Sequence, residues 1–137
     1  MRPTILLADD CEMLGVALGE LIAKTANLLD RVKDGGELFE RACVLRPDII
    51  ISDISMPIMN GLDVMRRLKA YGLPARFIFL TGHADEELAT EALSEGAAGF
   101  LVKPVVPEDM REAIETVARG DAYVPSLLSS RAARSHR

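Results

Sequence analysis

The chain has 137 residues, of which 49% are apolar and 27% charged, and its formal net charge is −5 at pH 7. This length and apolar content suit one compact domain with a hydrophobic core, and the acidic balance argues against a basic surface for nucleic acid. No apolar stretch approaches the roughly 18 residues that a membrane-spanning helix needs, and the first residues lack a signal-peptide pattern. We therefore expect a soluble, cytoplasmic protein that makes no membrane contact.

The two cysteines, Cys11 and Cys43, lie far apart in the sequence and have neither a metal-binding nor a redox spacing. Such isolated cysteines are typical of free thiols in a reducing cytosol rather than of a secreted disulfide framework. Cys11 could have a lowered pKa if a helix begins beside it. We nevertheless expect both side chains to act as small apolar groups without redox chemistry.

The apolar residues alternate between two spacings along the chain. Short runs rich in branched apolar residues predict strands, and recurrences every three or four residues between them predict helices. Pro47 ends the second predicted helix because proline disfavours helix before it, and Gly96 and Gly120 are typical of the residues that follow a helix. In chain order, we predict a strand at 4–8, a helix at about 14–22, a strand at 28–32, a helix at about 38–45, a strand at 48–52, a helix at about 61–72, a strand at 76–80, a helix at about 85–96, a strand at 99–102 and a helix at about 107–120.

The strict alternation of strands and helices predicts one α/β domain over residues 1–120. The third and fourth strands are apolar at nearly every position, which is typical of parallel strands that helices cover on both faces. We therefore expect a five-stranded, doubly wound parallel sheet. The last stretch, residues 121–137, loses the apolar periodicity and carries arginines, and we interpret it as a C-terminal tail or a truncated linker.

Reactive polar residues follow four of the five predicted strands. Asp9 and Asp10 follow the first strand, Asp53 the third, Thr81 the fourth and Lys103 the fifth. The carboxyl ends of parallel strands lie at one edge of a sheet, and open α/β sheets bind their ligands there. The spacing therefore predicts that these five side chains converge on one pocket.

The residue types in this pocket favour phosphoryl chemistry. Two carboxylates 4 Å apart repel each other by about 4 kcal/mol at an effective dielectric constant of ~20, so cations must offset the three acids. Lys103 can supply one charge, and Mg²⁺ can supply the rest because it prefers oxygen ligands and bridges to phosphate. Asp53 could then act as a nucleophile that forms an aspartyl phosphate, with Thr81 as a hydrogen-bond donor to a phosphoryl oxygen.

Four motifs, "LLADD", "DISMPIMNG", "FLTGHA" and "GFLVKP", occur in an order and spacing that resemble the receiver domain of two-component response regulators. The resemblance covers residues 4 to about 120. It implies a flavodoxin-like (βα)5 fold with strand order 2-1-3-4-5. It also implies that Asp53 accepts a phosphoryl group from a phosphohistidine on a sensor histidine kinase or a histidine phosphotransfer protein.

The same resemblance implies a role for each pocket residue. Asp10 and Asp53 would ligate Mg²⁺ together with the main-chain carbonyl of Ser55, and Asp9 would act through a water molecule. Lys103 would pair with the acids and, after phosphorylation, with the phosphate. The domain would be a signalling module rather than an enzyme, with only Mg²⁺-dependent self-phosphorylation and slow autodephosphorylation.

Two residues are implied to carry the signal away from the pocket. Thr81 would swing toward the phosphoryl group, and Phe100 would be the aromatic switch that follows it. The response would appear on the face formed by the fourth helix, the fifth strand and the fifth helix, where a partner or a second copy would dock. The Lys103–Pro104 bond is expected to be cis, as it usually is in the family.

The loop after the acceptor carries further expectations. Pro57 and Gly61 would shape this loop so that no helix begins too close to Asp53. The resemblance also implies that Ser55, and His83 two residues after Thr81, tune the rate of phosphate hydrolysis, although His83 is as easily interpreted as a solvated loop residue.

Other functions on the same fold stay open at this point. A phosphatase that acts through an aspartyl intermediate would need a second acid two residues after the nucleophile, where this chain has Ser55. A flavin or nucleotide carrier would need a glycine-rich phosphate loop or more aromatic residues. A phosphorylation-independent scaffold would not need the complete acid set. The ending "ARGDAYVP" resembles the junction to a DNA-binding module, so nucleic acid is an expected partner only if such an output domain exists.

Overall fold

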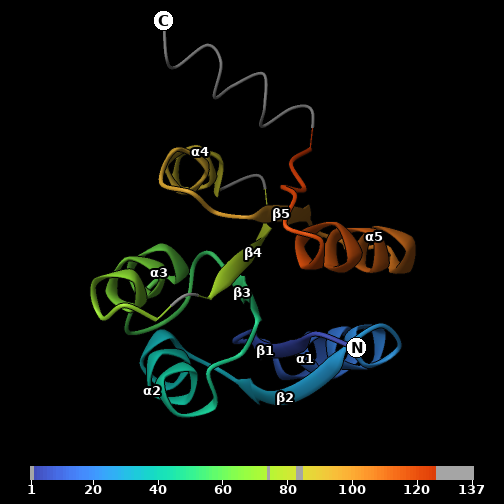
Figure 1. Cartoon of the computed structure of the whole chain (residues 1–137), viewed down its shortest axis with the longest axis horizontal. Coiled ribbons are helices and arrows are strands. Elements are labelled where there is room, and N and C mark those ends of the chain that lie inside the picture. Colours follow the sequence, from blue (N-terminus) through green and yellow to red (C-terminus); the bar gives the residue numbers. More distant parts are fainter. Residues whose placement is uncertain (1, 74, 83–84, 126–137) are drawn as a thin grey trace, which may run out of the picture.

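The computed structural model describes residues 2–73, 75–82 and 85–125 of the chain, and there strands and helices alternate (Figure 1). In chain order, they are β1 (Thr4–Ala8), α1 (Glu12–Ala23), β2 (Asn27–Val32), α2 (Gly35–Leu45), β3 (Ile49–Asp53), α3 (Gly61–Ala70), β4 (Arg76–Thr81), α4 (Glu86–Ser94), β5 (Gly99–Val102) and α5 (Pro107–Ala118). Every predicted strand and helix is present.

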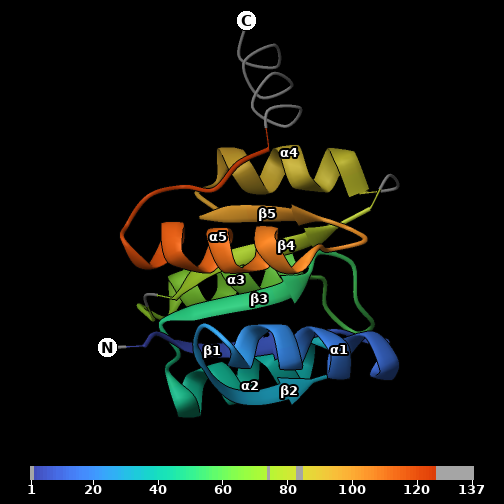
Figure 2. The ribbon, with the colours of Figure 1, turned by 90° about the vertical axis from the view of Figure 1, so that its right-hand side faces the viewer.

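The strands form one parallel sheet in the order β2-β1-β3-β4-β5, which confirms the flavodoxin-like topology. Helices α1 and α5 cover one face, and α2, α3 and α4 cover the other (Figure 1). Figure 2 looks at the sheet from the side of α1 and α5, and the arrows of its strands run in the same direction. The carboxyl ends of all strands therefore lie along one edge.

Burial of the central strands explains why their sequences are so apolar. All five residues of β3 are buried, as are five of the six residues of β4. Ile49 and Ile51 face the α1 and α5 side, where they pack with Ile22 and Ile114. Because the intervening residues face the other helical layer, each face of these strands requires its own apolar set.

The two central strands end one residue later than predicted. Asp53 is the last residue of β3 and lies opposite Leu80, and Thr81 is the last residue of β4 and lies opposite Val102. Main-chain pairing with the neighbouring strand thus continues through both polar residues. The sheet therefore fixes the main chain of both residues and limits where their side chains can lie.

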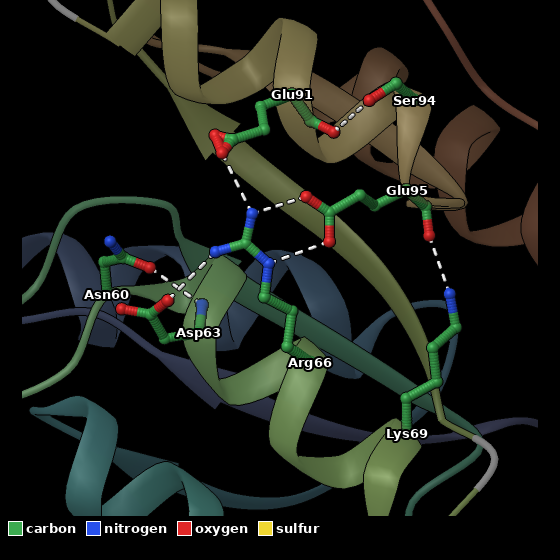
Figure 3. A network of polar contacts seen from close by, with 7 residues as sticks. All are labelled: Asn60, Asp63, Arg66, Lys69, Glu91, Ser94 and Glu95. Carbon is green, nitrogen blue, oxygen red and sulfur yellow. Dashed lines mark hydrogen bonds and ion pairs between the residues drawn. The ribbon is translucent and has the colours of Figure 1, made fainter.

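An ion-pair network ties α3 to α4 (Figure 3). The guanidinium group of Arg66, on α3, donates to Glu91 at 2.9 Å and through its Nε atom to Glu95 at 2.8 Å, both on the side of α4. It also contacts Asp63 in its own helix at 3.2 Å. Lys69, one turn further along α3, donates to the main-chain oxygen of Glu95 at 2.7 Å. Two cationic side chains of α3 therefore contact the C-terminal end of α4.

The segment that follows α5 returns to the sheet. Tyr123 forms a parallel bridge with Gly99. The Phe100 N–H donates to the Tyr123 carbonyl, and the Tyr123 N–H donates to the Ala98 carbonyl, both at 2.9 Å. Residues around 123 therefore cover the outer edge of β5.

Two expectations from composition can be compared with the structure. Cys11 is exposed and Cys43 is partly buried, and both are free thiols. No helix in the described ranges combines the length and the apolar character needed to cross a membrane.

Candidate functional site

Three carboxylates meet at the carboxyl edge of the sheet. Asp9 and Asp10 directly follow β1, and Asp53 ends the neighbouring strand β3. One carboxylate oxygen from each residue lies within 4.8 Å of those from the other two. Asp9 and Asp53 are only 4% and 2% exposed, whereas Asp10 is exposed to solvent. The cluster therefore has two buried members and one member at its opening.

Lys103 supplies a cation to the buried members of this cluster. Its Nζ atom lies 2.5 Å from Oδ1 of Asp53, and its side chain is about one-third exposed. The main-chain N–H of Lys103 donates to the Thr81 carbonyl at 2.8 Å, which holds the residue beside the end of β4. The Lys103–Pro104 bond is cis, as expected from the sequence. Residues from β1, β3, β4 and the end of β5 are thus brought together at one place.

Burial shifts the ionisation of Asp53. Loss of solvent raises the pKa of its carboxyl group to about 7, and the negative charge of Asp9 acts in the same direction. Contact with Lys103 opposes this rise. Burial also works to lower the pKa of Lys103, but contact with Asp53 and the charges of Asp53, Asp9 and Asp10 outweigh it, so the net pKa is raised. Lys103 therefore stays protonated while Asp53 can exchange its proton near neutral pH.

Two buried oxygens in this cluster lack hydrogen-bond donors. Oδ2 of Asp9 and Oδ2 of Asp53 are buried and accept no hydrogen bond from the described residues, whereas the buried Oδ1 of Asp53 has the Lys103 ammonium group as its charged partner. Oδ1 of Asp9 accepts the Cys11 N–H at 2.8 Å. Buried carboxylates without donors are strongly unfavourable unless a cation satisfies them. An all-oxygen, unsatisfied set of this kind fits a hard divalent ion such as Mg²⁺.

Gly61 allows the loop after β3 to close tightly over the strand end. A Cβ atom at this position would lie 2.6 Å from the Asp53 carbonyl oxygen and 2.8 Å from a ring carbon of Phe79. The Gly61 N–H donates to the Ile54 carbonyl at 2.8 Å. No side chain fits there, which explains why a glycine occupies this position in the loop after Asp53.

The loop residue Ser55 contacts a side chain that the sequence did not single out. Its hydroxyl donates to Oδ1 of Asp85 at 2.9 Å, and Oδ2 of Asp85 accepts the Gly82 N–H at 2.9 Å. The sequence indicated Asp85 only as the start of a helix. The available signal was the position of Asp85, three residues after the glycine that follows β4. Aspartate often accepts nearby main-chain N–H groups in turns.

The two expected switch residues lie in different surroundings. Thr81 is 4% exposed at the end of β4, adjacent to the site. Phe100 is fully buried within β5, and its ring centroid lies 6.1 Å from that of Phe79. His83, the other expected tuning residue, lies outside the described residues.

Comparison with known proteins identifies the family. The sequence model of the response regulator receiver domain matches residues 5–115. The chain belongs to this family. It is 34% identical over 128 residues to the nitrate/nitrite response regulator protein NarL of Escherichia coli, a match that covers 92% of this chain and 59% of NarL. It is 30% identical over 120 residues to the chemotaxis protein CheY of Thermotoga maritima, covering 87% of this chain and all of CheY.

Solved structures agree with this receiver-domain assignment. The signal receiver domain of the NarL response regulator from Mycobacterium tuberculosis is 27% identical and superimposes with a TM-score of 0.77, over 87% of this chain and 98% of that one. The receiver fold and the two-component signalling class predicted from the four motifs are therefore confirmed. The chain spans 59% of the length of E. coli NarL, so the receiver domain is the part that the two have in common.

Proposed function

We propose that this receiver domain accepts a phosphoryl group on the carboxylate of Asp53 from a phosphohistidine of a sensor histidine kinase or a histidine phosphotransfer protein. In this step, a carboxylate oxygen forms a bond to phosphorus as the bond between phosphorus and the histidine nitrogen breaks, and the imidazole leaves with the electron pair. The observation that carries the proposal is the buried Asp53 carboxylate, whose Oδ1 atom pairs with Lys103 and whose Oδ2 atom accepts no hydrogen bond from the described residues.

The metal site is proposed on the same residues. Asp10, Asp53 and the main-chain carbonyl of Ser55 would hold Mg²⁺, and Asp9 would act through a water molecule. The proximity of the three carboxylates and their all-oxygen chemistry support this assignment. Bound Mg²⁺ would neutralise charge on the phosphoryl oxygens. The Cys11 N–H keeps the Asp9 side chain in a fixed orientation beside this position.

The remaining groups would hold the phosphoryl group and report its presence. The Lys103 ammonium group would move its contact from Asp53 to a phosphoryl oxygen, and the Thr81 hydroxyl would donate to another. Because the Lys103 N–H is bonded to the Thr81 carbonyl, the two residues are mechanically linked. Phe100 would change its packing in response, and α4, β5 and α5 would then present a different face to a partner or a second copy.

Slow loss of the phosphoryl group follows from the same site. Water would attack phosphorus and release inorganic phosphate and the free Asp53 carboxylate. Ser55 stands where a second acid would assist such hydrolysis, so we propose a long-lived signalling state rather than turnover of small phosphate esters. The free thiols are in keeping with a cytoplasmic location, and nucleic acid would be contacted only through an output domain.

Phosphotransfer from acetyl phosphate tests the proposal. We expect the wild-type chain, incubated with acetyl phosphate and Mg²⁺, to gain the mass of one phosphoryl group, and peptide mass spectrometry to locate it on Asp53. The Asp53→Asn variant should gain none. Modification at another residue, or equal modification of both proteins, would show that Asp53 is not the acceptor.

A further inference from the structure

Asp85 occupies the N-cap position of α4 but does not cap that helix. An aspartate at this position ordinarily accepts a hydrogen bond from an N–H of the first helical turn, and the Asp85 side chain accepts none there. Both of its oxygens are instead used across the loops, Oδ1 by the Ser55 hydroxyl and Oδ2 by the Gly82 N–H. The carboxylate therefore joins the loop after β3 to the loop after β4.

The two donors that Asp85 occupies lie on the segments that follow the phosphoacceptor and its neighbouring strand. Ser55 follows Asp53 by two residues. Gly82 follows Thr81, and Thr81 ends the strand that pairs with the strand of Asp53. Main-chain N–H groups and hydroxyls at loop ends are the donors that stabilise phosphoryl oxygens in proteins. A phosphoryl group on Asp53 and the carboxylate of Asp85 are thus two anions placed near the same donors.

We propose that Asp85 is a positioning residue that competes with the phosphoryl group for the Gly82 N–H and the Ser55 hydroxyl. In the unphosphorylated domain, its carboxylate holds these donors and keeps the two loops together. Phosphorylation of Asp53 displaces the carboxylate, which releases the contact between Ser55 and the start of α4. This inference rests on the phosphoacceptor role proposed for Asp53.

The competition has a definite direction. If Asp85 only held the two loops together, its removal would make the phosphoryl-binding site less ordered, and the domain would bind a phosphoryl mimic more weakly. If Asp85 competes for the donors, its removal leaves them free and the domain binds the mimic more tightly. Asp85 also adds a negative charge near an acidic cluster, so a control must lose a charge without losing these two contacts.

The test measures the affinity of beryllofluoride, a phosphoryl mimic, by calorimetry in the presence of Mg²⁺. We expect Asp85→Asn and Asp85→Ala to bind it about fivefold more tightly than the wild-type chain, a size ordinary for coupling between sites. The matched control is Glu87→Gln, which removes an exposed charge in the first turn of α4 without touching Ser55 or Gly82. Its affinity should stay near that of the wild type.

A double substitution separates direct competition from a general loosening. In the Ser55→Ala background, where one of the shared donors is already absent, Asp85→Ala should strengthen beryllofluoride binding by a smaller factor than in the wild type. Unchanged or weaker binding by both Asp85 variants would overturn the inference. Equal strengthening by Glu87→Gln would overturn it as well, because general charge would then be the cause.

Acetyl phosphate distinguishes failure of this inference from failure of the function on which it rests. The acetyl oxygen–phosphorus bond breaks, acetate leaves with the electron pair, and Asp53 gains the phosphoryl group, while Asp85 is chemically unchanged. If the wild-type chain is not phosphorylated on Asp53, the proposed function fails and the competition fails with it. If it is phosphorylated but the Asp85 variants bind beryllofluoride no more tightly than the wild type, only the role of Asp85 fails.

Discussion

Asp53 combines two properties that rarely occur together in a carboxylate. It is almost completely buried, and its Oδ2 atom accepts no hydrogen bond from the described residues. Burial raises its pKa to about 7, against the effect of Lys103. The ionised form is therefore unfavourable in the metal-free domain, and a cation bound beside it would favour the ionised carboxylate that attacks phosphorus.

This raised pKa makes the stability of the metal-free domain depend on pH. The pKa of Asp53 is about 7 in the folded chain against an ordinary value of 3.8, so between these values the folded state holds a proton that the unfolded state lacks. Its contribution to stability is present below pH ~4 and is lost as pH rises toward 7. At pH 8, the folded domain carries the full penalty of a buried charge.

Replacing Asp53 with asparagine removes that penalty. We expect Asp53→Asn to raise the melting temperature in EDTA at pH 8 by about 3–8 °C, and this gain to shrink as pH falls from 7 toward 4. Scanning calorimetry across this pH range measures it. Addition of Mg²⁺ should reduce the advantage of the variant, because the ion stabilises the wild-type carboxylates. A gain that stays constant with pH would contradict the account.

The close approach at Gly61 sets a second expectation at the residue scale. Gly61→Ala places a Cβ atom 2.6 Å from the Asp53 carbonyl, so the loop or the strand end must shift. We expect a loss of about 1–3 kcal/mol of unfolding free energy and slower phosphorylation by acetyl phosphate. Gly36→Ala is the matched control, since its Cβ would come no closer than 3.3 Å to a side-chain oxygen. Equal stability of both variants in urea titrations would exclude the tight contact.

Helix α4 is held by its connections as much as by its packing. Ala89 and Ala92 are the fully buried residues of α4, and Leu88 and Leu93 pack against the core only partly buried. Polar contacts that also hold the helix include the Asp85 bridge at its start and the contacts of Arg66 with Glu91 and Glu95 near its end. An element with few buried apolar contacts is suited to move when its polar attachments change.

The Arg66 network should therefore control the motion of α4. Contact with Glu95 and Glu91 raises the pKa of the Arg66 guanidinium, and Arg66 in turn lowers the pKa of Glu95. We expect Arg66→Gln to increase hydrogen exchange of α4 amides relative to β3 amides, and high salt to reduce the difference from wild type. Arg111→Gln, which breaks an ion pair within α5, is the control and should leave α4 exchange unchanged. Unaltered α4 exchange in Arg66→Gln would contradict this expectation.

Element types could be predicted from the sequence because apolar spacing fixes them, whereas some boundaries could not. The fully apolar runs around Ile50 and Ile78 predicted strands buried on both faces, and the sheet confirms them. The predicted strands stopped before Asp53 and Thr81 because polar residues usually end such runs. Pairing with the next strand extends through both residues, and that pairing depends on tertiary contacts that periodicity does not contain.

At the scale of the whole molecule, the topology of a parallel sheet explains how residues nearly a hundred positions apart meet. Asp9, Asp53, Thr81 and Lys103 follow or end strands whose carboxyl ends share one edge, so the order of elements sufficed to expect their proximity. The bridge through Asp85 could not be expected in the same way. It depends on the course of two loops, and loop geometry follows from packing rather than from sequence spacing.

The chemical nature of the phosphorylated state tests the central claim most directly. The intact mass of the wild-type chain is measured after incubation with acetyl phosphate, with Mg²⁺ or with EDTA, and again after treatment with hydroxylamine, which cleaves acyl phosphates. We expect one added phosphoryl group that requires Mg²⁺ and is lost with hydroxylamine. A phosphoryl group that forms equally well in EDTA, or that resists hydroxylamine, would contradict an aspartyl phosphate formed at this acidic, cation-binding site.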